Sequence, residues 1–213
     1  MGQARLAEKA RRGRPPIEKA KVEATRIKLV HAGVAILTEK GFNSVGLDEI
    51  LTSVGVPKGS FYYYFNSKSE FGLTLIDSYA EYFARKLDYW FLDGTRSPLQ
   101  RLRNFVGDAR RGMERFGFRR GCLVGNLGQE MGSLPEPFRK RLIFVFNDWQ
   151  ARTAKCLEAA KSAGEISVEA DCEHLAALFW IGWEGAVLRA KLERSPTALD
   201  QFAAGFFALA QRR

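Results

Sequence analysis

The chain has 213 residues and a formal net charge of +9, from 33 Lys and Arg against 24 Asp and Glu. Hydrophobic residues make up 46%, which excludes a wholly disordered chain, and no apolar run approaches the ~20 residues that a membrane helix needs. The three cysteines lie far apart and there are two histidines, so we expect neither a disulfide framework nor a histidine-rich metal site. These features predict a cytoplasmic protein without a secretory signal.

Sequence motifs of common enzymes are absent. The chain has no Gly-x-Ser-x-Gly nucleophile motif, no phosphate-binding P-loop and no Gly-x-Gly-x-x-Gly run after a strand. Glu130 and Glu136 could be paired as carboxylates, but nothing in the sequence orients them. We therefore expect no enzyme, no catalytic residue, no metal ligand and no cofactor. An enzyme and an architectural protein that coats DNA are the alternatives.

Positive charge is concentrated at the N-terminus. Residues 1–28 hold nine basic and three acidic residues, so they contribute +6 of the net charge. We interpret residues 1–22 as a flexible basic arm, since Pro15-Pro16 interrupts any regular helix. Within it, Arg12-Gly13-Arg14-Pro15 resembles an AT-hook, whose arginines enter the narrow minor groove of A·T-rich DNA. This places Arg12 and Arg14 among the candidate DNA-binding residues; a tail that only aids solubility is the alternative.

Helical periodicity begins after this arm. Apolar residues at three- and four-residue spacing predict a first helix from about Ile27 that ends at Gly41. Two short helices follow, at about Leu47–Val54 and Lys58–Phe65, with a tight turn at Gly55-Val56-Pro57 between them. A longer helix followed by two short ones predicts a three-helix helix-turn-helix unit.

The third of these helices carries three adjacent tyrosines. Phe61 and Phe65 are four residues apart and share one face, so we expect both to be buried. A helix of two turns cannot also bury all three tyrosines, and at least two hydroxyls should face outward. Exposed hydroxyls beside lysines suit contacts with DNA phosphates. A tyrosine-rich core helix is the alternative.

The two short helices belong to a longer sequence motif whose residues keep a characteristic spacing. It comprises Gly41-Phe42, Val45–Ile50 and Gly55–Lys68. Over residues 25–72, the chain closely resembles the DNA-binding domain of TetR (tetracycline-repressor-like) regulators. The resemblance implies contacts to base edges in the major groove from Lys58, Gly59 and Tyr62. It implies contacts to phosphates from Ser60, Tyr63, Tyr64 and Lys68.

Two residues depart from the family pattern. Family members often carry Ser or Thr where this chain has Gly46, and Thr or Val where it has Leu47. Gly46 offers only its backbone N–H to a phosphate. The resemblance further implies an all-α fold, with a DNA-binding domain at residues 23–70 and a ligand-binding and dimerisation domain at residues 71–213. The expected partners are a palindromic DNA operator and a second copy of the chain.

Residues 72–213 have the pattern of a helical bundle. The expected helices lie at about 71–92, 99–116, 137–162, 171–193 and 197–210, and no strand is expected. Gly182, Ala186 and Ala190 repeat every four residues, which predicts close approach of two helices. With the last helix, this stripe suits a four-helix dimer interface. Ordinary packing within one chain is the alternative.

The segment Gly117–Gly132 is too rich in glycine for a stable plain helix. It resembles the Gly-Cys-Leu segment of family members that respond to electrophiles and, more closely, that of acrylate-utilisation regulators. We expect Arg119-Arg120 to lower the pKa of the Cys122 thiol. A small buried apolar role for Cys122 is the alternative. The candidate ligand-binding residues are Cys122, Asn126, Gln129, Glu130, Trp183, Arg119 and Arg120.

The function expected from these features is a ligand-responsive, homodimeric repressor. A small ligand, acrylate or a related carboxylate or electrophile, would push the helix Phe71–Trp90 and change the spacing of the two DNA-reading helices. Acrylate is both a carboxylate and a Michael acceptor, so reversible binding beside Cys122 and covalent addition to it both stay open. A redox or electrophile sensor without a reversible carboxylate ligand is the alternative.

Overall fold

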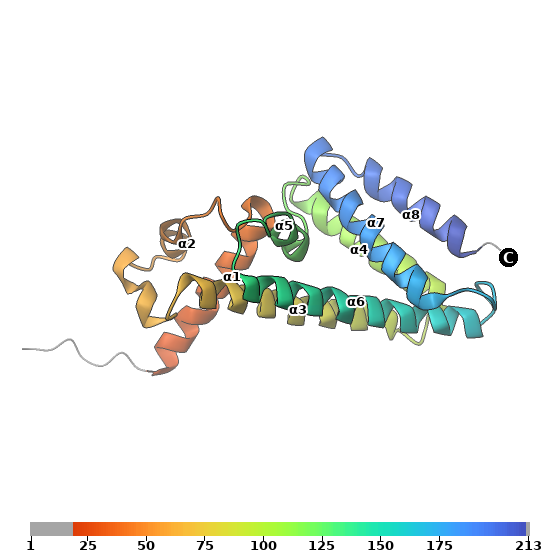
Figure 1. The fold of residues 1–213 in the computed structure, drawn as a ribbon, viewed down its shortest axis with the longest axis horizontal. Helices are drawn as coiled ribbons and strands as arrows, with labels where there is room; N and C mark the ends of the chain where they lie inside the picture. The colour runs from red at the N-terminus through yellow and green to blue at the C-terminus, as the bar shows by residue number, and fades with distance from the viewer. Residues whose placement is uncertain (1–18, 212–213) are drawn as a thin grey trace, which may run out of the picture.

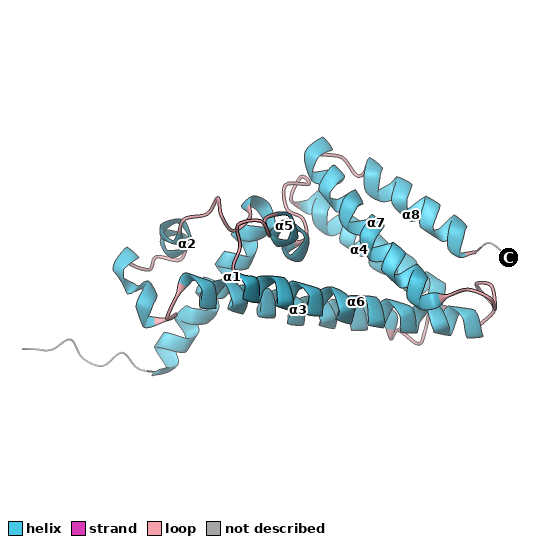
Figure 2. Ribbon diagram, viewed as in Figure 1, coloured by secondary structure: helices cyan, strands magenta, loops and turns pink. Residues whose placement is uncertain are grey.

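The computed structural model describes residues 19–211, and within them it is helical without strands (Figures 1 and 2). The short 3₁₀ helix η1 (Lys58–Tyr63) occupies the place of the expected third helix of the helix-turn-helix unit. Eight α-helices complete the described fold: α1 (Lys19–Lys40), α2 (Leu47–Ser53), α3 (Lys68–Phe91), α4 (Pro98–Arg115), α5 (Leu123–Gln129), α6 (Glu136–Ser162), α7 (Cys172–Glu193) and α8 (Thr197–Ala210). The predicted all-α fold is confirmed.

Local signals account for most helix boundaries. Ser67 caps α3, its hydroxyl accepting from the backbone N–H of Glu70 at 3.0 Å, and Asp171 caps α7 through His174 at 3.0 Å. Gly41 takes a left-handed conformation (φ +81°) where α1 ends. These boundaries agree with the sequence because capping depends on residues that are neighbours in the chain.

Two lobes share the long helix α3 (Figure 1). Its first turns pack with α1, and its Phe71 ring contacts Phe61 of η1. Its remainder runs beside α6 in the C-terminal lobe, where α4, α7 and α8 complete the bundle. The expected boundary between residues 70 and 71 therefore lies inside a continuous helix. The short helix α5 lies at the junction and contacts α1, α3 and α6.

Aromatic side chains fill the centre of the C-terminal lobe. The Trp149 and Trp180 rings lie 4.9 Å apart, and Phe83 lies 4.4 Å from Trp149 between centroids. Trp180 donates its indole N–H to the buried Thr153 hydroxyl at 3.0 Å, so its polar atom is satisfied inside the core. This packed core holds α3, α6 and α7 together behind the site described below.

Three expectations about elements need correction. Residues 19–22 of the expected arm are already helical, within α1. The expected third helix of the helix-turn-helix unit is 3₁₀ and ends at Tyr63. The glycine-rich segment contains α5, because its apolar face is buried and Cys122 caps its first turn; tertiary packing here outweighs the low helix propensity of glycine.

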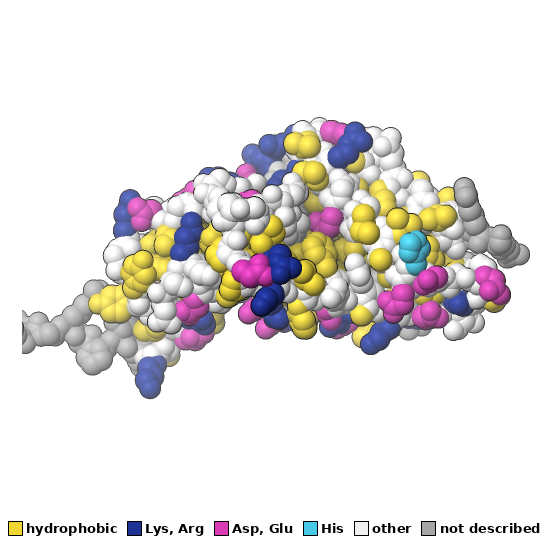
Figure 3. Space-filling model, in the orientation of Figure 1, with side chains coloured by type: hydrophobic (Ala, Val, Ile, Leu, Met, Phe, Trp, Pro, Cys, Tyr) yellow, Lys and Arg dark blue, Asp and Glu magenta, His cyan; other side chains and the backbone are white. Residues whose placement is uncertain are grey.

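The stripe of small residues on α7 is buried within the single chain. Ala186 and Ala190 are buried, and a Cβ at Gly182 would overlap the ring of Phe202 on α8. The predicted use of this stripe between two chains is therefore wrong, and the intrachain alternative holds. A different face of α7 and α8 is open: Ile181, Leu192 and Leu209 are exposed there. Figure 3 shows hydrophobic side chains at the surface over these two helices.

Candidate functional site

The 3₁₀ helix η1 is held against the core by one buried aromatic residue, Phe61. Phe61 is buried and its ring packs against Phe65 and Phe71, at centroid distances of 5.6 and 5.7 Å. Tyr62 and Tyr63 are 74% and 67% exposed, so two tyrosines face outward as the pattern predicts. Because buried Phe61 fixes η1 to the core, the hydroxyl groups of Tyr62 and Tyr63 lie on a well-packed surface helix.

Positive groups flank this surface. The Lys58 ammonium pairs with Asp48 of α2 at 2.7 Å, and the Lys68 ammonium lies over the Phe42 ring at 4.7 Å from its centroid. The Lys58 pair is exposed, and such pairs are weak, so a DNA group can replace Asp48.

The other expected DNA-binding residues are Gly59, Ser60, Tyr64, Arg12 and Arg14. Gly59 is exposed beside Lys58, while Ser60 and Tyr64 are half-buried. Arg12 and Arg14 lie outside the described residues.

A cavity of about 450 Å³ opens between the two lobes. Its walls come from α1, α3, α4, α7 and the segment before α5, so it contacts helices of both lobes. Its lining residues are His31, Val34, Ala35, Thr38, Ser78, Tyr79, Tyr82, Phe83, Arg85, Lys86, Ala109, Gly112, Met113, Phe116, Arg120, Gly121, Cys122, Trp183, Glu184 and Val187.

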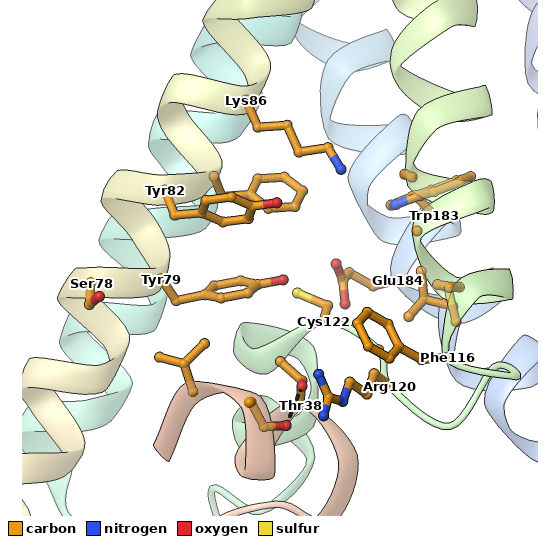
Figure 4. A pocket seen from close by; sticks show the side chains of 18 of the residues that line it. Thr38, Ser78, Tyr79, Tyr82, Lys86, Phe116, Arg120, Cys122, Trp183 and Glu184 are labelled. Atoms are coloured by element: carbon orange, nitrogen blue, oxygen red, sulfur yellow. Dashed lines mark hydrogen bonds between the residues drawn. The ribbon is translucent and has the colours of Figure 1, made fainter. Parts of the chain in front are cut away.

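Three polar side chains meet inside this cavity: Tyr79 from α3, Cys122 at the start of α5 and Glu184 from α7 (Figure 4). The Cys122 sulfur accepts from the Gly125 N–H at 3.4 Å. Burial raises the pKa of Glu184 to about 7. Tyr79 and Cys122 also have pKa values raised well above their usual range, chiefly by burial. Near neutral pH the cavity therefore offers a phenol, a thiol and a carboxyl group that readily holds its proton.

Two basic side chains of the cavity lining, Arg120 and Lys86, already have acidic partners. The Arg120 guanidinium stacks over Phe116 at 4.2 Å and lies 3.8 Å from the Glu39 carboxylate. Lys86 pairs with Asp108 at 2.8 Å. Their charge is therefore directed largely toward acids outside the polar cluster.

The expected activation of Cys122 by its basic neighbours is wrong. Burial and then the negative charge of Glu184 raise the pKa of the thiol. Arg119 is exposed and its guanidinium lies 3.9 Å from Glu39, while Arg120 faces Glu39 and Phe116. Adjacency in sequence did not place either guanidinium against the sulfur.

Three of the expected ligand residues on α5 lie outside the cavity lining. The Asn126 amide donates to the carbonyls of Leu37 and Thr38 at 3.0 and 2.9 Å. The Glu130 carboxylate accepts from the backbone N–H groups of Phe42 and Asn43 at 2.9 and 2.8 Å. We call these bonds from Asn126 and Glu130 the α5 clamp. It ties α5 to the end of α1 and the following turn, whereas Gln129 is exposed.

The cavity thus unites Cys122, Trp183 and Arg120 but not Arg119, Asn126, Gln129 or Glu130. It also contains Glu184 and Tyr79, which sequence reasoning missed as site residues. Glu184 left one signal: it is the single charged residue in the apolar run from Phe179 to Leu188. Tyr79 had no such signal, because its spacing matched that of core residues.

Comparisons with known proteins agree with both lobes. The model of bacterial regulatory proteins of the tetR family matches residues 29–72, and that of the tetracyclin repressor-like C-terminal domain matches residues 98–206. The transcriptional regulator AcuR of Cereibacter sphaeroides is 55% identical over 201 residues, covering 94% of this chain and 91% of AcuR. The chain belongs to the TetR family of transcriptional regulators.

Relatives and solved structures extend this assignment. This TetR-family chain is 30% identical to the repressor DhaR of a Mycobacterium species, over 83% of this chain and 87% of DhaR. The regulatory protein TetR from Rhodobacter sphaeroides superposes with a TM-score of 0.83 at 57% identity, covering 85% of this chain and 96% of that one. Reduced Escherichia coli NemR superposes with a TM-score of 0.79 at 27% identity, covering 86% and 95%. The chain is a TetR-type repressor, of a family that binds operator DNA as homodimers.

Two further observations concern the described part of the chain alone. None of its helices combines the length and the apolarity that a membrane span requires. No group of three or more His, Cys, Asp or Glu side chains there is arranged to hold a metal ion.

Proposed function

We propose that this repressor releases its operator when a small carboxylate, acrylate or a close analogue, enters the cavity between the lobes. The observation that carries the proposal is the convergence of Tyr79, Cys122 and Glu184 in one cavity. Hydrogen-bonding groups that converge beside aromatic and aliphatic walls suit a small ligand with one polar end. The similarity to AcuR and the resemblance to acrylate-utilisation regulators support the same ligand class.

DNA recognition occurs at η1 in this proposal. Lys58, Gly59 and Tyr62 contact base edges, and Ser60, Tyr63, Tyr64 and Lys68 contact phosphates. Arg12 and Arg14 add contacts in the flanking minor groove. In the dimer, two copies of η1 bind successive major grooves of a palindrome, about 34–36 Å apart.

Coupling between the two sites follows two routes. The cavity is lined by α3, which continues into the DNA-binding lobe, and directly by residues of α1. The second route is α5: Cys122 caps its first turn, and the α5 clamp holds its other end to the turn after α1. A ligand that displaces Cys122 moves α5 and, through the clamp, α1. A coupling free energy of roughly 1–3 kcal/mol is typical of such linkage.

Reversible binding beside Cys122 is favoured over covalent addition. A thiol reacts as its thiolate, and burial opposes thiolate formation here. Electrophile sensing through covalent modification of Cys122 is the second candidate function, favoured by the similarity to NemR alone.

The test combines operator release with intact mass spectrometry. We expect acrylate to release operator from the wild type without adding mass, and its saturated analogue propionate to act as well. Cys122→Ser should change the acrylate concentration needed, whereas Cys156→Ser, a buried thiol outside the cavity, should not. An acrylate adduct on Cys122 together with inactive propionate would establish the covalent alternative. Unchanged release by Cys122→Ser would remove Cys122 from the site.

A further inference from the structure

Glu184 has an unusual position among the cavity residues. It is the single acidic side chain in the cavity lining, and no cation lies within ion-pair distance of it in the described structure. Its carboxyl group lies directly over the Cα of Gly125, where any Cβ would overlap it. The missing side chain of Gly125 on α5 therefore leaves room for this carboxyl group, and no positive charge among the described residues pairs with it there.

Titratable and charged side chains from three walls share the cavity with Glu184. They are His31 from α1, Tyr79, Tyr82, Arg85 and Lys86 from α3, and Arg120 and Cys122 from the segment leading into α5. Lys191 lies on the same helix as Glu184 but outside the cavity lining. Lys86 and Arg120 have acidic partners elsewhere. Lys191 is directed to the carbonyls of Thr38 and Glu39 and to Asn126, at 3.4, 3.4 and 3.1 Å. The immediate neighbours of the carboxyl group are therefore the neutral Tyr79 and Cys122.

We propose that Glu184 determines ligand class by donating a proton: a carboxylate ligand binds to the protonated form of Glu184, so binding above neutral pH takes up one proton from solvent. This proposal rests on the proposed function. An ionised Glu184 would repel a carboxylate bound beside it. The protonated group instead donates its O–H to the ligand, and the Tyr79 hydroxyl supplies a second donor.

Protonation of Glu184 gives the site a measurable pH dependence. The pKa near 7 means that the group is mostly protonated at pH 6 and mostly ionised at pH 8. The affinity for acrylate, which stays ionised throughout, should fall about tenfold for each pH unit above the pKa. Acrylamide has nearly the same shape without the charge, so its affinity should change by less than threefold.

The decisive measurement is titration calorimetry of the full-length wild type with acrylate and with acrylamide at several values between pH 6 and 9. Repeating each titration in two buffers of different ionisation enthalpy counts the protons taken up. We expect uptake of nearly one proton per acrylate at pH 8 and none at pH 6. Glu184→Gln keeps a donor but removes the titration, so its acrylate affinity should be flat with pH. His31→Gln is the control at the histidine of the cavity lining and should keep the wild-type profile.

The outcomes separate this inference from the proposed function. Acrylate binding that releases operator but is independent of pH, without proton uptake, overturns the role of Glu184 and leaves the ligand assignment standing. The role of Glu184 is also overturned if His31→Gln removes the pH dependence of acrylate affinity. No acrylate binding at any pH contradicts the proposed function itself. The wild-type measurements need no variant, so a misfolded Glu184→Gln would not leave the inference undecided.

Discussion

At the scale of residues, the expected DNA contacts Tyr62 of η1 and Lys68 of α3 differ in how much the fold depends on them. Tyr62 is largely exposed, and its ring meets Phe61 edge-on at a centroid distance of 5.3 Å, so it contributes little to the core. Lys68 lies on the first turn of α3, half-buried against Phe42. A substitution at Tyr62 should therefore disturb folding less than one at Lys68, and both test contacts with DNA.

Tyr62→Ala and Lys68→Ala should weaken operator binding in different ways. Loss of a base contact at Tyr62 should cost roughly 1–3 kcal/mol at the cognate operator and less on random DNA. Loss of a phosphate contact at Lys68 should weaken all sequences about equally and reduce the salt slope by about one. Fluorescence anisotropy over a salt series measures both quantities, with thermal melting as the folding control. Equal losses on cognate and random DNA for both variants would contradict the assignment.

Glu184 should make the stability of the ligand-free protein depend on pH. Its folded pKa of about 7 lies above the ordinary value of 4.5, so folding favours the protonated form. The associated stability is complete below pH 4.5 and is lost as pH rises through 7. From pH 5 to pH 8, the wild type should lose on the order of 2 kcal/mol relative to Glu184→Gln. Urea unfolding at equal protein concentration measures this difference; parallel pH curves for the two proteins would refute it.

At the scale of elements, α5 and Lys191 of α7 hydrogen-bond to the end of the first helix. Besides the α5 clamp, the Gly121 N–H donates to the Thr38 carbonyl at 2.9 Å. The carbonyls of Leu37 and Thr38 belong to the last turn of α1, where helix carbonyls lack partners within the helix. The clamp satisfies these groups and at the same time couples α5 to the DNA-binding lobe.

Glu130→Gln should weaken the coupling between ligand and operator. A carboxylate accepts from both Phe42 and Asn43, whereas an amide has one acceptor oxygen and no charge. We expect acrylate to bind about as before but to reduce operator affinity several-fold less. Glu136→Gln is the matched control, because Glu136 pairs with Arg139 on the surface of α6. The comparison needs operator affinities with and without saturating acrylate. An unchanged ratio in Glu130→Gln would exclude the clamp as a route.

Gly182→Ala and Gly185→Ala test how α7 packs. The new Cβ at position 182 would overlap the Phe202 ring, and such overpacking costs about 1–3 kcal/mol. At position 185 the same change meets nothing within 4 Å in the single chain. Thermal melting should therefore show a lower stability for Gly182→Ala than for Gly185→Ala. The reverse order would mean that α7 and α8 are packed differently.

At the scale of the whole molecule, we propose that the exposed apolar face of α7 and α8 is the dimer interface. Leu192 is 73% exposed there, and Ile181 and Leu209 are exposed on the same two helices. Burying one such leucine is worth about 1.5–3 kcal/mol, and a twofold interface buries it twice. A second copy of the chain is the partner proposed for this face, because regulators of this family form homodimers.

Leu192→Glu should therefore disrupt the dimer without unfolding the chain. Leu92→Glu is a matched control, since Leu92 is 74% exposed but follows α3, away from that face. Sedimentation velocity should show a monomer for Leu192→Glu and a dimer for Leu92→Glu, and operator affinity should fall with the first alone. A dimeric Leu192→Glu would place the interface elsewhere.

The sequence by itself determined the helical elements and the DNA-binding unit. Helix α8 begins at Thr197 and ends at Ala210, as its pattern predicts, because periodicity and helix-breaking residues act over a few neighbouring positions. The exposed tyrosines of η1 were predictable for the same reason. The open face of α7 was not, since intrachain packing of α8 decides which side of that helix is buried.

Tertiary structure alone decided the composition of the cavity. Tyr79, Cys122 and Glu184 are separated by many residues, and no local pattern brings three helices to one point. The same folding turned Asn126 and Glu130 toward α1 and away from the ligand. It also reversed the expected pKa of Cys122: two arginines precede the thiol in sequence, but burial and a neighbouring carboxyl group determine its protonation in space.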